Sequence, residues 1–132
     1  MQQWTAQCSC GSVEAVCLGE PVRISVCHCW ECQRRSGGPF SAQARWPADR
    51  VEIKGAVSEW TRTESNGAAC AYKFCPVCGS TIAFTNTSLP DLVAVPIGAF
   101  ARTDLPRPTV SVYEARKHPW VEILGDEVEH LD

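Results

Sequence analysis

The chain has 132 residues and a net charge of −3, and this length predicts one domain over residues 1–132. The acidic balance argues against a dedicated nucleic-acid-binding protein, which usually carries a basic excess. No apolar stretch approaches the roughly 18 residues that span a bilayer. The first 20 residues also lack the pattern of a signal peptide, so we expect a cytoplasmic protein with no membrane partner.

Apolar and polar residues alternate along most of the chain, as in Val22-Arg23-Ile24-Ser25-Val26, and this is typical of half-buried strands. In chain order, the pattern predicts strands at 13–17, 22–26, 41–46, 51–53, 59–63, 71–74, 81–84, 92–95 and 110–113. A short helical turn is expected at 31–35, ended by Ser36-Gly37-Gly38-Pro39, and the tail at 122–131 is a second helix candidate. Many short strands with frequent turns predict an all-β fold, an antiparallel sandwich or open barrel.

Nine cysteines are the most informative feature of the composition. Seven of them form three clusters with short spacings, and the other two are isolated. Without a secretion signal, and with an odd total, these thiols are expected to be reduced and to serve metals or chemistry rather than disulfides.

The first and last clusters are Cys8-Ser9-Cys10-Gly11 and Cys75-Pro76-Val77-Cys78-Gly79. In an extended segment the side chains at i and i+2 point to the same face, so both sulfurs of the first cluster can reach one ion. In the last cluster, a glycine after the tight CxxC turn can take a left-handed conformation. Together they offer the four thiolates of a closed, structural zinc site, which would tie residues about 70 apart.

The middle cluster is Cys27-His28-Cys29-Trp30-Glu31-Cys32. A zinc ion held by three protein ligands keeps a position free for water or substrate, as catalytic sites do. His28 is an alternative fourth ligand, although in an extended segment its ring should point away from the flanking sulfurs. A purely structural role for all seven clustered cysteines is the competing interpretation.

The two isolated cysteines, Cys17 and Cys70, lie in apolar surroundings. We interpret both as small core residues with no metal.

These motifs resemble a known family. CxCGxV at Cys8, CHCxxCxRxSGGPF at Cys27, FCxxCGS at Phe74 and the pair Pro119-Trp120 are similar to those of the glutathione-dependent formaldehyde-activating enzymes, a family that includes centromere protein V. The resemblance implies a zinc-containing β-fold like that of methionine sulfoxide reductase B. It also implies that one zinc is structural and the other catalytic, with the ligands Cys8, Cys10, Cys75 and Cys78 for the first and Cys27, Cys29 and Cys32 for the second.

The founding activity of that family joins formaldehyde and glutathione into S-(hydroxymethyl)glutathione, formally a carbon–sulfur lyase reaction. The resemblance therefore implies glutathione, or a related small thiol, as substrate. The segment 113–118 departs most from the family pattern, which leaves the shape of the substrate pocket open.

Glutathione has two carboxylates, and Arg34 and Arg35 follow the triplet of Cys27, Cys29 and Cys32 directly. Because arginine offers a planar fork to a carboxylate, these two residues are candidate substrate contacts, and Arg45 is a third arginine expected near them. Solvated surface charges are the competing interpretation. His28 is also a candidate proton carrier, since its reference pKa lies near neutrality.

Two other functions are compatible with the same cysteines. One is a non-catalytic, zinc-stabilised module that binds a thiol or a protein partner. The other is a redox-labile zinc site that releases its metal when the thiols are oxidised. The sequence does not indicate an oligomeric state.

Overall fold

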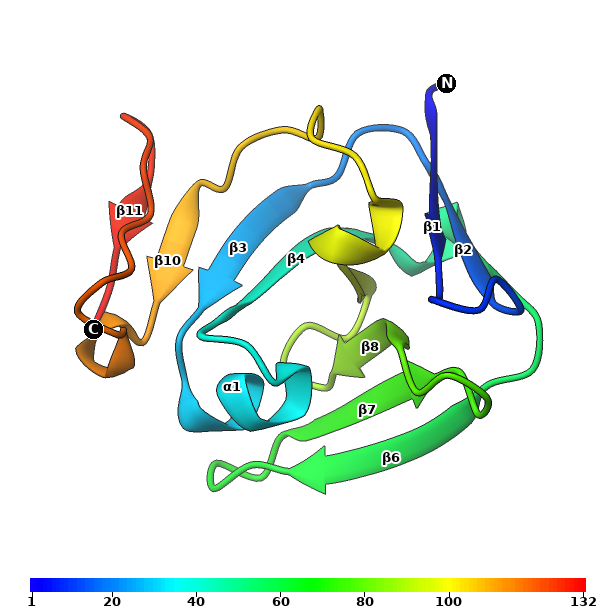
Figure 1. The fold of residues 1–132 in the computed structure, drawn as a ribbon, viewed down its shortest axis with the longest axis horizontal. Coiled ribbons are helices and arrows are strands. Elements are labelled where there is room, and N and C mark those ends of the chain that lie inside the picture. The colour runs from blue at the N-terminus through cyan, green and yellow to red at the C-terminus, as the bar shows by residue number, and fades with distance from the viewer.

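The computed structural model describes all residues from 1 to 132. Two sheets make up most of the protein (Figure 1): a three-stranded sheet in the order β1-β2-β5 and an eight-stranded sheet in the order β11-β10-β3-β4-β9-β8-β7-β6. The strands are β1 Gln3–Gln7, β2 Glu14–Leu18, β3 Arg23–Cys27, β4 Ser41–Pro47, β5 Val51–Lys54, β6 Ser58–Thr63, β7 Ala69–Phe74, β8 Thr81–Asn86, β9 Leu92–Pro96, β10 Val110–Val112 and β11 Glu129–His130. Helix α1 spans Trp30–Ser36, and the short 3-10 helices η1 Ala48–Arg50, η2 Ile97–Phe100 and η3 Glu114–Arg116 lie in connections. None of these helices has the length and hydrophobicity of a membrane-spanning segment.

The all-β expectation is confirmed, and each of the nine predicted strands lies within two residues of an observed one. The expected turn at 31–35 is the core of α1, which Cys29 caps at its start and Gly37, with φ of 72°, at its end. The helix candidate at 122–131 is wrong: this tail is irregular, apart from β11, which runs parallel to β10. The N–H groups of Glu129 and Leu131 bond to the C=O groups of Thr109 and Ser111 in the β10 segment, so no helical ladder forms there.

The sheet is mixed rather than purely antiparallel, because β10 pairs in parallel with both β3 and β11. The other pairs are antiparallel. The sequence analysis did not predict strand β1. Its side chains nevertheless alternate between buried and accessible positions, since Trp4 and Ala6 are buried and their neighbours are not.

The hydrophobic core lies between the two sheets. Trp4 and Cys17 of the small sheet pack with Ile24, Trp46 and Ile82 of the large one, and all five are almost fully buried. This packing covers one face of the large sheet, so the cysteines on its other face are available for a different role.

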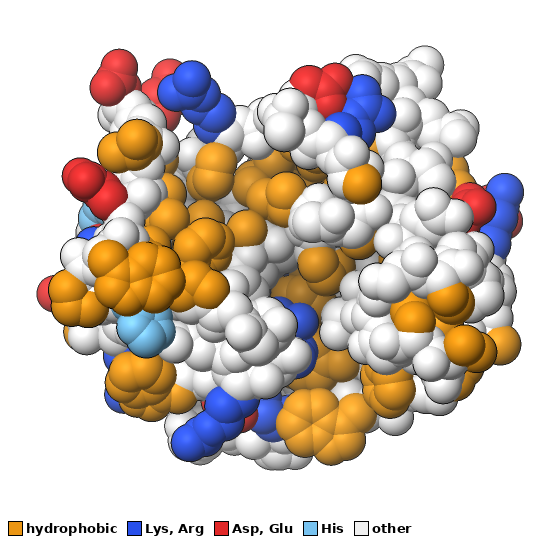
Figure 2. Space-filling model, in the orientation of Figure 1, with side chains coloured by type: hydrophobic (Ala, Val, Ile, Leu, Met, Phe, Trp, Pro, Cys, Tyr) orange, Lys and Arg blue, Asp and Glu red, His pale blue; other side chains and the backbone are white.

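The second face of the large sheet is concave and holds α1. In Figure 1, β3 and β4 lie on one side of α1 and β6 and β7 on the other. Strand register fixes which residues share this face, because paired residues project to the same side. The pairs Cys27↔Ser41, Ser25↔Gln43, Arg45↔Ala94, Phe84↔Ala94, Tyr72↔Phe84 and Arg62↔Cys70 place their side chains there. Figure 2 shows a hollow in the middle of the molecule, with Lys or Arg atoms at its wall.

Candidate metal centres

The first and last cysteine clusters meet in space, as the sequence predicted. Cys8 and Cys10 follow β1, and Cys75 and Cys78 lie in the turn between β7 and β8. The four sulfurs lie within 4.8 Å of one another. The Sγ of Cys10 is 3.7 Å from that of Cys8 and 3.6 Å from that of Cys75.

This four-cysteine group fits a zinc ion. Zinc–sulfur bonds of about 2.3 Å in a tetrahedron put the sulfurs about 3.8 Å apart, close to the distances found. Backbone N–H groups also face the sulfurs, as thiolates require: Val13 N–H lies 3.2 Å from Cys8 Sγ, and Val77 N–H lies 3.4 Å from Cys75 Sγ. The expected left-handed glycine after this turn is confirmed at Gly79, with φ of 81°.

Two serines support the four-cysteine group, and the sequence analysis missed both. The Oγ of Ser12 is 3.1 Å from Cys10 Sγ and 3.2 Å from Cys75 Sγ. Hydrogen bonds from the hydroxyl and then the backbone of Ser80 lower the pKa of Cys78 to about 5, which favours the thiolate. Serine is too common in turns for this role to be recognised from sequence.

The turn at Gly55 packs directly against the backbone of Ser12, next to the four-cysteine group. Gly55, between β5 and β6, has φ of 105°, and a Cβ there would lie 2.2 Å from the carbonyl oxygen of Ser12. Only a residue without a side chain allows this approach.

The middle cluster forms a second, separate group. The sulfurs of Cys27, Cys29 and Cys32 lie within 4.8 Å of one another, and no fourth His, Cys, Asp or Glu completes the group. Cys27 ends β3, Cys29 caps α1 and accepts a 3.3 Å bond from the Cys32 N–H. Hydrogen bonds from Cys27 and then Cys32 lower the pKa of Cys29. Cys29 is therefore the thiol of this group that loses its proton most readily. The donor set fits a metal ion with an open position.

His28 lies outside the group of Cys27, Cys29 and Cys32, as its place between two of these cysteines in an extended segment predicted. Its side chain is fully buried, its Nε2 is 2.8 Å from Ser111 Oγ, and its ring centroid is 5.8 Å from that of Phe40. Burial lowers the pKa of His28, which favours the neutral ring, and the ring packs between β10 and Phe40. The side chain therefore has a structural place.

Gln33 joins the triplet to the C-terminal segment. Its Nε2 donates to the backbone oxygens of His28, at 2.8 Å, and Arg116, at 3.2 Å, while its Oε1 lies 2.8 Å from His118 Nε2. The amide thus fixes α1 to the backbone between Cys27 and Cys29. Nothing in the local sequence marks this glutamine, because its partner His118 is 85 positions away.

Arg34 and Arg35, the candidate substrate contacts of the sequence analysis, have different surroundings. The side chain of Arg34 is 78% exposed and pairs with Glu31 at 3.4 Å. Arg35 lies over the rings of Tyr72 and Phe84, with its guanidinium carbon 4.9 Å from each centroid. Arg35 thus faces the concave side of the sheet, whereas Arg34 has a solvated surface position.

Arg45 also lies on the concave face, at the end of a buried polar row. The hydroxyl of Ser41 donates to Gln43 Oε1 at 2.9 Å, and Gln43 Nε2 donates to Ser25 Oγ at 2.9 Å. Arg45 Nη1 donates to the same Ser25 oxygen at 2.8 Å. Burial, and then the charge of Arg23, lower the pKa of Arg45, whereas negative charge on Cys27 and other thiols acts the other way.

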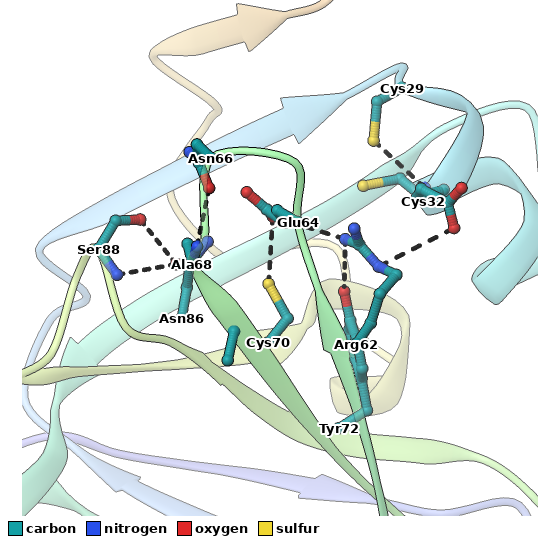
Figure 3. Close-up of polar contacts among 12 residues, drawn as sticks. Cys29, Cys32, Arg62, Glu64, Asn66, Ala68, Cys70, Tyr72, Asn86 and Ser88 are labelled. Atoms are coloured by element: carbon teal, nitrogen blue, oxygen red, sulfur yellow. Dashed lines mark hydrogen bonds and ion pairs between the residues drawn. The ribbon is translucent and has the colours of Figure 1, made fainter.

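The rim of the concave face carries a further polar group (Figure 3). Arg62 on β6 bonds to the Tyr72 hydroxyl at 3.3 Å and pairs with Glu64 at 3.6 Å and with Glu31 at 3.9 Å. The thiol of Cys70 donates to Glu64 Oε1 at 3.3 Å. The positive charge of Arg62 is therefore already matched by two carboxylates.

The two isolated cysteines are outside both metal groups. Cys17 is fully buried in the main core, and burial raises its pKa to about 12. Cys70 is also buried and packs with Tyr72, Phe84 and Ala94.

Comparisons with known proteins identify a similar fold and a matching family. A Rhodobacter sphaeroides protein whose crystal structure was determined by structural genomics has a similar fold, with a TM-score of 0.56 and 22% identity over 72% of this chain and 85% of that chain. A search of curated proteins gives no match. The sequence model of the glutathione-dependent formaldehyde-activating enzymes matches residues 3–116. The chain therefore belongs to the glutathione-dependent formaldehyde-activating enzyme family.

Proposed function

We propose that this protein is a zinc-dependent enzyme of the carbon–sulfur lyase type that forms or breaks the adduct of an aldehyde with glutathione, as in S-(hydroxymethyl)glutathione. One observation carries the proposal: three convergent thiols on a concave face with no fourth protein ligand. The family match over most of the chain supports the choice of aldehyde and thiol.

The two cysteine groups have separate roles in this proposal. Cys8, Cys10, Cys75 and Cys78 would hold a structural zinc ion, and Cys27, Cys29 and Cys32 would hold a catalytic one. Bound zinc with an open position stabilises a substrate thiolate or polarises a carbonyl oxygen. The helix cap at Cys29 and the Gln33 amide keep the three thiols oriented.

The proposed reaction balances without a redox partner. The thiol sulfur forms a bond to the aldehyde carbon, the carbonyl π electrons move to oxygen, and the proton released by the thiol ends on that oxygen. The reverse step breaks the same carbon–sulfur bond. Arg35, on the concave face, binds a substrate carboxylate; contact by Arg34 stays a prediction.

The test is the exchange between formaldehyde, glutathione and their adduct, followed by exchange NMR. Zinc-loaded protein should raise the exchange rate above the spontaneous rate, and Cys29→Ser should remove most of the added rate, because it takes away one of the three thiolates that would hold the catalytic zinc. Cys70→Ser is the matched control, because Cys70 lies on the same face outside the triplet. Equal rates for wild type and Cys29→Ser contradict the proposal, and saturable glutathione binding without a rate effect indicates the non-catalytic module instead.

A further inference from the structure

Arg45 is a half-buried cation that no carboxylate of the protein contacts. Its side chain makes one hydrogen bond, to Ser25, and no ion pair. A guanidinium has five N–H donors, so most of those on Arg45 have no protein acceptor. Placing such a charge away from water is costly unless an anion joins it.

The neighbours of Arg45 add to its positive charge. Arg23 is its directly paired residue on β3, and like charges in that relation are unfavourable. Arg35, on the same concave face, forms no ion pair, and its Nε is buried without a partner. Arg34, Arg62 and Arg102, by contrast, each pair with a carboxylate. The uncompensated arginines thus include two that share the face of the triplet.

The protein holds the Arg45 guanidinium in one place. Ser25 accepts from both Gln43 and Arg45, and Gln43 is fixed at its other end by Ser41. Ser25, Gln43 and Ser41 are all buried, so this orientation is determined before any ligand arrives. Register places Cys27 beside Ser41 and Ser25 beside Gln43, so the row leads from the triplet to Arg45.

We propose that Arg45 is a specificity-determining residue that binds a carboxylate of the substrate, so that the site selects acidic thiols over neutral ones. A guanidinium can bind a carboxylate through two parallel hydrogen bonds. The thiol end of such a substrate lies toward Cys27, Cys29 and Cys32, and Arg35 provides a second positive charge. The inference rests on the proposed function for the identity of the reacting group.

The first experiment needs no variant and no turnover. S-methylglutathione lacks a free thiol, and binding of this compound and of its dimethyl ester to wild-type protein is measured by titration calorimetry. The acid should bind at least about tenfold more tightly, as expected for a charge-assisted bond worth about 1.5 kcal/mol or more. Equal affinities, or no binding of either compound, overturn the proposal.

The second experiment assigns the selection to Arg45. N-acetylcysteine and N-acetylcysteamine differ only in the carboxylate, and kcat/KM for adduct exchange is measured with each. Arg45→Gln should lower the value for N-acetylcysteine at least about tenfold and leave that for N-acetylcysteamine within twofold, with Arg45→Lys in between. Arg107→Gln, at an exposed position, is the charge-matched control.

The outcomes separate this inference from the proposed function. An equal fall with both thiols, or no fall with either, assigns Arg45 no role in selection and overturns the inference while the exchange activity stands. Selective binding of S-methylglutathione that Arg45→Gln abolishes, in a protein that accelerates no exchange, supports the inference and contradicts the proposed function. Circular dichroism of each variant confirms that the compared proteins are folded.

Discussion

The two cysteine groups differ in how they are built. The four-cysteine group joins turns from opposite ends of the first 80 residues, and its sulfurs accept bonds from backbone and serine groups around them. The triplet comes from six consecutive residues at the junction of β3 and α1, and two of its cysteines are only half-buried. A ligand set that links distant segments constrains the whole chain. A ligand set from one short segment can change occupancy or geometry while the rest of the fold persists.

The largest expected effect comes from breaking the four-cysteine group. Cys75→Ser should abolish cooperative thermal unfolding and lower the bound zinc, because Cys75 is a ligand of the proposed structural zinc and also packs, fully buried, in the core. Circular dichroism and metal analysis measure the two effects. Cys17→Ala, a change in the same core outside the metal groups, should keep both; a cooperative, fully metallated Cys75→Ser protein would contradict the structural assignment.

Breaking the triplet should have a different outcome. Cys29→Ser should lower the zinc content from two ions per chain to one and keep a cooperative transition, since no core residue is altered. Metal analysis and thermal denaturation on the same sample make the comparison direct. If Cys29→Ser unfolds as completely as Cys75→Ser, the proposed difference between the groups does not exist.

Gly55 allows a graded test of the four-cysteine side. Gly55→Ala should destabilise the protein by about 2–4 kcal/mol, because the new Cβ forces the Ser12 backbone away in addition to the strain of a positive φ. Gly67→Ala is matched to it: Gly67 has φ of 88° and no atom within 4 Å of the added Cβ. It should cost only the strain, about 1–2 kcal/mol, so urea unfolding curves of equal midpoint for the two variants would contradict the role of Gly55.

A substitution of Gln33 tests the support of the Cys27, Cys29 and Cys32 triplet in the same way. Gln33→Ala should cost about 1–3 kcal/mol, because it leaves the His28 and Arg116 carbonyls without their donor. Zinc release to a chelator should become faster for one of the two ions only. Gln3→Ala, at an exposed position of β1, is the control, and a uniform change in the release of both ions would show that Gln33 acts on the whole fold.

The smallest expected effect distinguishes two neighbouring arginines. Arg34→Gln should change the free energy of unfolding by less than about 0.5 kcal/mol, since its pair with Glu31 is exposed. Arg35→Gln removes a guanidinium from two aromatic rings and should cost about 1–2 kcal/mol. Urea unfolding of both variants decides, and equal costs would place both side chains in similar surroundings.

The sequence predicts most of this architecture because its strands depend on local alternation. Cysteine spacing likewise predicts which sulfurs converge, since the CxC and CxxC segments preorganise each pair. The tail at 122–131 was misjudged because its residues bond to β10, and the parallel pairing of β10 with β3 joins segments more than 80 positions apart. Pairing at such a distance leaves no local signal.

The surroundings of the metal groups were less accessible to prediction. Arg34 and Arg35 are adjacent in sequence, but a helix turns consecutive side chains to different sides, so one is solvated and the other packs on Tyr72. Ser12, Gln33 and the row that ends at Arg45 depend on contacts across strands or turns. These contacts are properties of the folded sheet, not of the motifs.

The long span of the four-cysteine group has a consequence for biosynthesis. All residues of the triplet leave the ribosome together, so this group can form as soon as the first 40 residues are free. The four-cysteine group has to wait until Cys78 emerges, and until then Cys8 and Cys10 have no partners. Because chains elongate at about 5–20 residues per second, these two thiols stay without their partners for several seconds in each nascent chain.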